Sequence, residues 1–143
     1  TRSIRPILRA VPTEAEIATM FETVLRERFE LDPLALRESE DAWRFQIGAL
    51  RLEAVVHYVD LRVGGYLCAM DGGVDIDAVY RDLAEAEPLG LARIVESDNY
   101  LRVSVKLPFA LVTSASIEQA IRDCVALADA PQAHRLTGKW RRW

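Results

Sequence analysis

At 143 residues the chain has the size of one domain and is long enough to bury a hydrophobic core. Half of its residues are hydrophobic and 28% are charged, which excludes a disordered chain, and no apolar run is long enough for membrane insertion. The net charge of -4 is distributed as an acidic body between basic ends, which argues against a nucleic-acid partner because an acidic surface repels phosphates.

The cysteines Cys68 and Cys124 lie within apolar patterns and have neither the spacing of a metal site nor that of a disulfide framework. No signal-peptide pattern opens the sequence. We therefore expect reduced thiols and a cytoplasmic location.

The first predicted helix follows an N-terminal arm, residues 1–12, that has no clear period. Thr13 and Glu16 have the spacing of a capping box, in which each side chain accepts a hydrogen bond from the other residue's backbone N–H group. Apolar residues then recur at helical spacing along one stripe. The helix should end near Glu30, because the following Asp32-Pro33 pair discourages its continuation.

Residues 42–70 alternate between apolar and polar side chains, which is the pattern of strands with one buried face. The alternation breaks at residues 48–49 and 59–60, so the segment predicts three consecutive strands joined by short turns. We expect the rest of the domain to be organised around this meander.

The two glycines inside the third predicted strand, Gly64-Gly65, are typical of a bulge or of a close approach between backbones. If the alternation continues through them, Leu67 and Ala69 face the core, and Cys68 and Met70 lie on the opposite face.

A second helix should begin at a cap formed by Asp75 or Asp77 and stop before Pro88. Two further strands, at about residues 91–96 and 101–107, flank a polar turn and predict a hairpin. Ser116 and Gln119 have capping-box spacing, and we expect them to open a third helix.

The predicted element order is therefore α-βββ-α-ββ-α. This order indicates an α+β fold in which helices cover one face of an antiparallel five-stranded sheet. We place this single domain at residues 13–130, followed by a basic aromatic tail, residues 131–143, that has no period.

Residues that could carry catalysis have a simpler structural interpretation. His57 and His134 are the only histidines, and neither has a partner at metal-ligand spacing. The acidic residues at 71–77 lack the glycine and glutamate positions of a calcium loop and are better explained as turn and cap residues. No serine, cysteine or lysine lies in a nucleophile motif. We therefore expect no enzyme, no bound metal and no cofactor.

The polar face of the predicted sheet is rich in basic residues, whereas the helices carry most of the acid. A solvated outer face explains this asymmetry without a partner and is the simpler alternative. The sharper hypothesis is that the basic face docks an acidic segment, either from this chain's own helices or from another protein. The basic residues on this face are Arg44, Arg51, Arg62, Arg93, Arg102 and Lys106.

The tail ends in Lys-Trp-Arg-Arg-Trp, residues 139–143. Such a patch can stack on bases, lie at a membrane interface or dock into an apolar groove. We expect docking, on its own domain or on a neighbouring subunit, and neither nucleic-acid binding nor membrane insertion. The predicted partner-binding residues are Arg44, Arg51, Arg62, Arg102, Trp140 and Trp143.

The order of elements, the acidic body and the length resemble those of the type III secretion chaperones and the YbjN-like bacterial proteins. The resemblance is clearest over residues 42–128 and includes a strand, a polar turn, a strand and a proline-closed exit, LARIVESDNYLRVSVKLP, at residues 91–108. The basic aromatic tail is a departure from that family pattern.

The resemblance implies a homodimer formed around the second helix and the neighbouring strands, with apolar grooves on helix one and the early strands that hold an extended client segment. Carried to this chain, the dimer interface is Tyr80, Leu83, Leu91 and Ile94. The sequence thus predicts a non-enzymatic, chaperone-like protein-binding module. The alternative is a small-ligand-binding or regulatory α+β domain, which would have a closed pocket with convergent polar groups.

Overall fold

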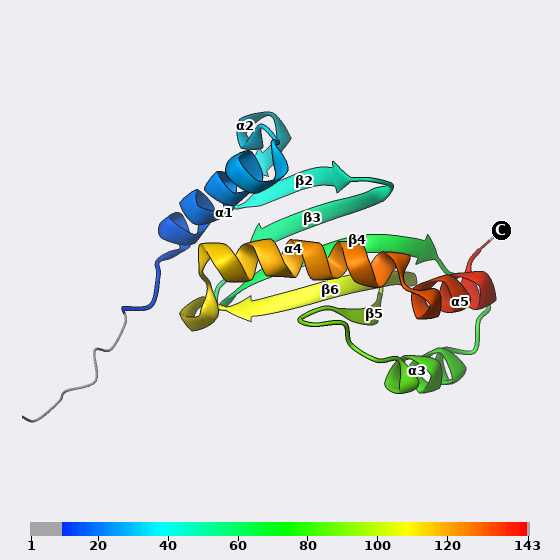
Figure 1. The fold of residues 1–143 in the computed structure, drawn as a ribbon. Coiled ribbons are helices and arrows are strands. Elements are labelled where there is room, and N and C mark those ends of the chain that lie inside the picture. The colour runs from blue at the N-terminus through cyan, green and yellow to red at the C-terminus, as the bar shows by residue number, and fades with distance from the viewer. Residues whose placement is uncertain (1–9, 143) are drawn as a thin grey trace, which may run out of the picture.

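The computed structural model describes residues 10–142 and has the α+β architecture that the sequence predicts, with one six-stranded antiparallel sheet (Figure 1). The strands lie in the order β1-β2-β3-β4-β6-β5. The elements are α1 (Glu14–Phe29), α2 (Pro33–Leu36), β1 (Arg37–Ser39), β2 (Ala42–Ile47), β3 (Leu50–Val56), β4 (Asp60–Ala69), α3 (Ile76–Glu85), β5 (Arg93–Ser97), β6 (Tyr100–Pro108), a short 3-10 helix η1 (Phe109–Leu111), α4 (Ser114–Asp129) and α5 (Pro131–Trp140).

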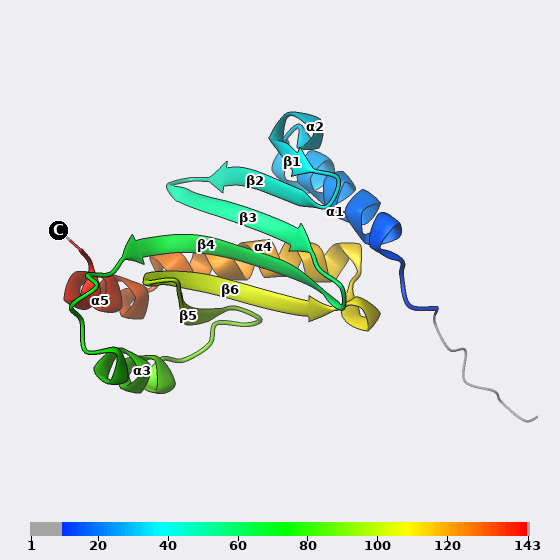
Figure 2. The ribbon, with the colours of Figure 1, turned by 180° about the vertical axis from the view of Figure 1, so that it is seen from behind.

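The helices lie on one side of the sheet. Helix α4 runs along β4 and β6 and contacts α1, and α5 packs at the end of α4 beside β4 (Figure 1). Helix α3 lies at the edge of the sheet and contacts β5. From behind, the strands lie in front of α4, and no helix of the described residues crosses them (Figure 2). The sheet therefore has one face in the core and one open face.

The core forms where α1 and α4 meet the inward residues of the strands. Trp43 and Phe21 are fully buried, with their ring centroids 4.7 Å apart. The predicted alternation is confirmed in β2, β3 and β6, where inward residues are buried, apart from the half-buried Ile47 at the end of β2, and outward residues are not. The capping box between Thr13 and Glu16 is also confirmed, as is the polar turn between β5 and β6.

The predicted facing of the end of β4 is wrong for Cys68, Ala69 and Met70, whereas Leu67 packs against the core as predicted. The pairing of β4 with β6 shifts between Tyr66 and Cys68, so one extra residue enters the strand there. Cys68 and Met70 consequently face the core and are buried, whereas Ala69 is half-buried opposite Tyr100. A bulge of one residue reverses every later side chain, because side chains alternate with a period of two.

Several short elements differ from the prediction. The connection after α1 contains α2 and a sixth strand, β1, which pairs with β2 at the edge of the sheet. Ser116 does not begin α4 but lies at its third position, where it completes a capping box with Thr113. Most of the tail is helical, as α5, and its inward residues are Ala133, Leu136 and Trp140.

Candidate functional site

The open face of the sheet gathers the polar side chains that the alternation turns away from the core. Its residues meet across the strands in rows set by the register. One row joins Arg44, Glu53, Gly64, Ser104 and Arg93, from β2 to β5. The neighbouring rows are Val55, Arg62 and Lys106 on one side, and Tyr66, Arg102 and Val95 on the other. A basic face is thus built by five strands.

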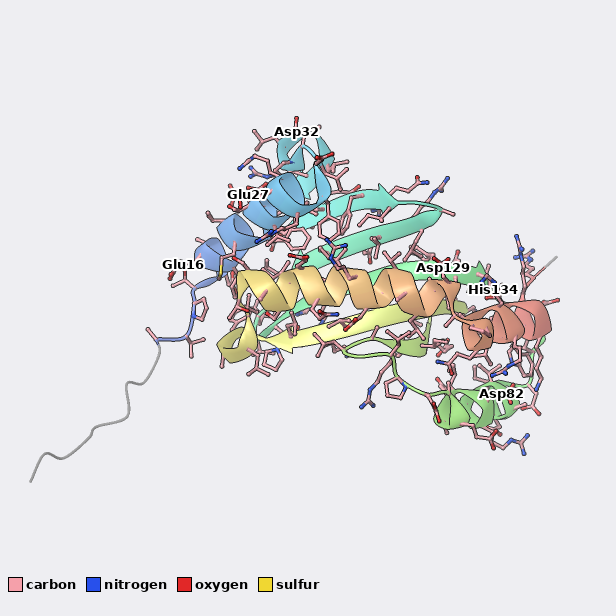
Figure 3. The ribbon with its side chains drawn as sticks, viewed as in Figure 1. Glu16, Glu27, Asp32, Asp82, Asp129 and His134 are labelled. Carbon is pink, nitrogen blue, oxygen red and sulfur yellow. The ribbon has the colours of Figure 1, made fainter. Side chains whose placement is uncertain are left out.

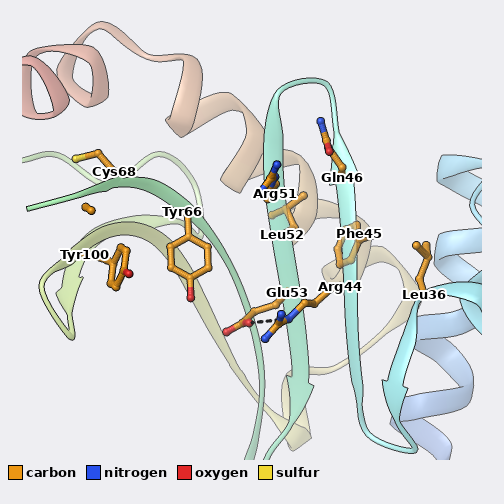
Figure 4. Close-up of a pocket in the computed structure, with 11 residues that line it drawn as sticks. Leu36, Arg44, Phe45, Gln46, Arg51, Leu52, Glu53, Tyr66, Cys68 and Tyr100 are labelled. Atoms are coloured by element: carbon orange, nitrogen blue, oxygen red, sulfur yellow. Dashed lines mark ion pairs between the residues drawn. The ribbon is translucent and has the colours of Figure 1, made fainter. Parts of the chain in front are cut away.

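Two hollows lie side by side on this face and share Glu53. The first has a volume of about 600 Å³ and lies where β3 and β4 part, because their ladder stops at the Leu52–Gly65 pair while β4 continues to Ala69. The second, of about 570 Å³, lies over Gly64 and Ser104. Residues that line the first hollow in Figure 4 include Arg44, Arg51, Glu53, Tyr66 and Tyr100.

An aromatic cluster lines the first hollow, and Arg102, which lines the second hollow, packs on it. The Tyr66 and Tyr100 rings meet edge to face with centroids 5.3 Å apart, and the Arg102 guanidinium carbon lies 4.2 Å from the Tyr66 centroid. Stacking on a tyrosine holds the guanidinium in place, and its Nε atom is buried without a hydrogen-bond partner among the described residues. The sequence prediction included Arg102 but not the two tyrosines. The alternation of side chains nevertheless places Tyr66 on the same face of its strand as Arg62.

The ion pairs of the face divide its basic residues into two groups. Glu53 lies 3.8 Å from Arg44 and 3.6 Å from Arg102, and Asp60 lies 2.9 Å from Arg62. In residues 10–142, no ion pair or side-chain hydrogen bond is found for the other group, which consists of Arg51, Arg93 and Lys106.

The acidic residues lie mainly on the helical side of the molecule. Figure 3 shows Glu16 and Glu27 on α1, Asp129 on α4 and Asp82 on α3. The structure therefore has the asymmetric charge distribution that the sequence predicts, with a basic open face in a chain whose net charge is -4.

Trp140, a predicted partner-binding residue, is half-buried against α3. Its indole Nε1 donates a hydrogen bond of 2.8 Å to Asp82, and the Lys139 ammonium lies 2.8 Å from the same carboxylate. Lys139 and then Trp140 hold the pKa of Asp82 below its ordinary value. The expected docking of the tail on its own domain is thus observed for Trp140, whereas Trp143 lies outside the described residues.

The four residues predicted for a dimer interface differ in exposure. Tyr80 and Leu91 are 52% and 43% exposed, and the Tyr80 hydroxyl donates a hydrogen bond to Glu96. Leu83 is half-buried, and Ile94 is buried in the core with 6% exposed. Only Tyr80 and Leu91 therefore offer substantial apolar surface for self-association, and the interface stays a prediction.

The thiols are buried in the folded chain. Burial raises the pKa of Cys124 to about 12, and burial is also the main cause that raises the pKa of Cys68. Within residues 10–142, no three His, Cys, Asp or Glu side chains lie together as a metal site would need. In the same part of the chain, no helix has the length and apolar character to cross a membrane.

Comparison with known sequences gives no relative: no protein-family model and no curated protein matches the chain. Solved structures do match. SpcS, from the ExoT–SpcS complex of Pseudomonas aeruginosa, is 17% identical with a TM-score of 0.55, and the match covers 79% of this chain and 95% of SpcS. SpcU, from the ExoU–SpcU complex of the type III secretion system of the same organism, is 14% identical with a TM-score of 0.55, covering 83% and 96%.

The Yersinia pestis type III secretion chaperone SycH, solved with a fragment of YscM2, is 13% identical with a TM-score of 0.55. That match covers 78% of this chain and 96% of SycH. At such low identities the likeness concerns the fold alone. The chain has the fold of the type III secretion chaperones, as its sequence resemblance predicted.

Proposed function

We propose that this protein is a non-enzymatic, chaperone-like binding module that holds an extended segment of a partner protein on the open face of its sheet. The observation that carries the proposal is the pair of adjoining hollows on that face. A sheet face that combines apolar, aromatic and charged side chains can contact alternate side chains of an extended chain. The similar structures, solved as complexes with effector or partner proteins, support a protein partner.

The small-ligand alternative receives less support from the geometry. A small-molecule site encloses most of its ligand between apolar walls. Here both hollows open to solvent along the sheet, and they adjoin at Glu53, so they form a continuous surface for a longer occupant.

We also propose that the protein is a cytoplasmic homodimer, with Tyr80 and Leu91 in the contact between the two copies. Both residues are exposed, on α3 and before β5, and neither lines the two hollows of the open face. Sedimentation of the purified chain, alone and with Tyr80 and Leu91 changed to serine, measures this self-association.

The proposed function is tested by selecting random peptides that bind the purified full chain and measuring their dissociation constants. We expect selected peptides to bind. The substitution Ser104→Trp places a bulky ring in the second hollow and should weaken the affinity for these peptides at least about tenfold, equivalent to about 1.4 kcal/mol. Ala126→Trp, at an exposed position of α4, adds the same ring on the helical side and should leave binding unchanged.

Circular dichroism spectra and melting curves check that both variants are folded. The proposal is contradicted if the selection yields no binding peptide, or if the folded Ser104→Trp protein binds the selected peptides as tightly as the unchanged chain.

A further inference from the structure

The second hollow, over Gly64 and Ser104, is lined by Arg62 and Lys106, and Arg93 lies beside it in the row of Ser104. Arg62 on β4 lies directly opposite Lys106 on β6. Arg93 pairs with Ser104, two residues before Lys106, and is therefore its diagonal neighbour. Like charges directly opposite each other on a sheet are destabilising. The cluster formed by Arg62, Arg93 and Lys106 is therefore an arrangement that a nearby anion would stabilise.

The acidic groups of the face do not balance this cluster. Asp60 contacts Arg62, and Glu53 contacts Arg44 and Arg102 in the adjoining rows. Glu96 also borders the hollow, but it accepts the hydrogen bond from Tyr80 at the edge of the sheet. Within the described residues, Arg93 and Lys106 have no carboxylate in an ion pair.

The walls of the hollow indicate which kind of anion fits. Val55 and Val95 line it, so apolar surface lies between the basic groups. Glu53 lies where the two hollows adjoin and would repel a continuous chain of phosphates. A peptide offers what this surface complements, because carboxylates and apolar side chains can take turns at every second residue and so share one face of an extended segment.

We propose that the partner segment is acidic: its carboxylates bind Arg62, Arg93 and Lys106, and its apolar side chains lie on Val55 and Val95. This inference rests on the proposed function and specifies the partner by its charge. Arg44 and Arg102 contribute less to this binding, because both form ion pairs with Glu53 and Arg44 forms a second one with Glu38. The helices of the chain are themselves acidic, so a second copy is the competing occupant.

The test uses two labelled peptides of about ten residues, long enough at about 3.4 Å per residue to cross the sheet. In one peptide every second residue is in turn Glu and then Val or Leu, so that both kinds share one face of the extended chain, and in its twin every Glu is Gln. Fluorescence anisotropy with the full chain should show the Glu peptide binding at least about tenfold more tightly. This preference should fall as NaCl rises from about 50 to about 500 mM, because salt screens exposed charges.

Two double variants locate the preference on the molecule. Arg62→Gln with Lys106→Gln should weaken the Glu peptide about tenfold and leave the Gln peptide unchanged. Arg26→Gln with Arg81→Gln removes the same charge from exposed helix positions and should change neither. Equal binding of the two peptides, or an unchanged Glu peptide in the Arg62/Lys106 variant, overturns the inference.

Two other outcomes distinguish this inference from the proposed function and from self-association of the chain. If selected random peptides bind at Ser104 but show no preference for acid, the proposed function stands and the acidic partner is wrong. If the unchanged chain self-associates at low salt and loses this association in the Arg62/Lys106 variant, the occupant is a second copy and the inference is overturned.

Discussion

Replacing Gly90 by alanine should destabilise the protein by roughly 3–5 kcal/mol, measured by denaturant unfolding. Gly90 has a φ angle of +56°, which strains any residue with a Cβ atom. An added Cβ would also collide with the carboxylate of Asp123, which is buried in α4 with 5% exposed. That carboxylate accepts a 2.8 Å hydrogen bond from the backbone N–H of Leu91, so moving it leaves a partly buried donor unpaired.

Two other glycines provide controls for this substitution. Gly48 has a φ angle of +59° but open space around its Cβ position, so Gly48→Ala should show the backbone strain alone, about 1–2 kcal/mol. Gly72 also has open space, and Gly72→Ala should change stability by less than about 0.5 kcal/mol. If Gly90→Ala costs no more than Gly48→Ala, the Asp123 carboxylate does not restrict the turn.

Replacing Glu22 by leucine should cost about 3 kcal/mol, because this carboxylate joins α1 to the first strands. It accepts a 3.0 Å hydrogen bond from the indole of the fully buried Trp43 and hydrogen bonds of 2.6–3.1 Å from Arg37. Leucine leaves the indole donor buried without a partner. Glu27→Leu, at an exposed position of the same helix, should have an effect below about 0.5 kcal/mol.

The contribution of Glu22 should also depend on pH. Burial acts to raise its pKa, but the hydrogen bonds from Arg37 and Trp43 outweigh burial and leave the pKa below its ordinary value. Because the pKa is lowered by folding, the stabilisation is present above the unfolded pKa of about 4.3 and is lost as the pH falls through the folded pKa.

The stability difference between the unchanged chain and Glu22→Gln should therefore be largest near neutral pH and shrink in acid, where the unchanged carboxyl is protonated. A difference that stays constant from neutral pH to about pH 3 would show that the charge of Glu22 is not the source of its stabilisation.

The alternation of apolar and polar residues is sufficient to predict most of the sheet. It fails where a bulge adds a residue to a strand. From Leu101 to Leu107 strict alternation predicts the buried face correctly, because no bulge interrupts β6. In β4 the extra residue between Tyr66 and Cys68 reverses the facing of the strand's last residues. The Gly64-Gly65 pair indicates that parity can shift, but the position of the shift depends on pairing with β6.

The helix ends show a similar limit. Thr113–Ser116 and Ser116–Gln119 both have the spacing of a cap, and local sequence does not decide between them. Helix α5 has a short apolar stripe and is stabilised by docking, with Trp140 against Asp82 of α3. Contacts between residues that are far apart in sequence leave no mark on the local spacing of apolar residues.

The sequence predicts the candidate site as a set of basic residues on one face. The structure shows that some of these residues have acidic partners and others do not. Glu53 forms ion pairs with Arg44, directly opposite it on β2, and with Arg102 on β6, beyond β4. The same register sets Lys106 opposite Arg62. Parity alone assigns each residue to a face, but only the pairing of strands decides which basic residues have acidic partners.

The measurement that tests the binding face most directly is the NMR spectrum of valine methyl groups while a selected peptide is added. Val55 and Val95 lie on the open face, whereas Val63, Val103 and Val105 face the helices. We predict that the methyl signals of Val55 and Val95 shift as the peptide binds and that those of the three inward valines move much less. Shifts confined to the inward valines and the helices would contradict a binding site on the open sheet.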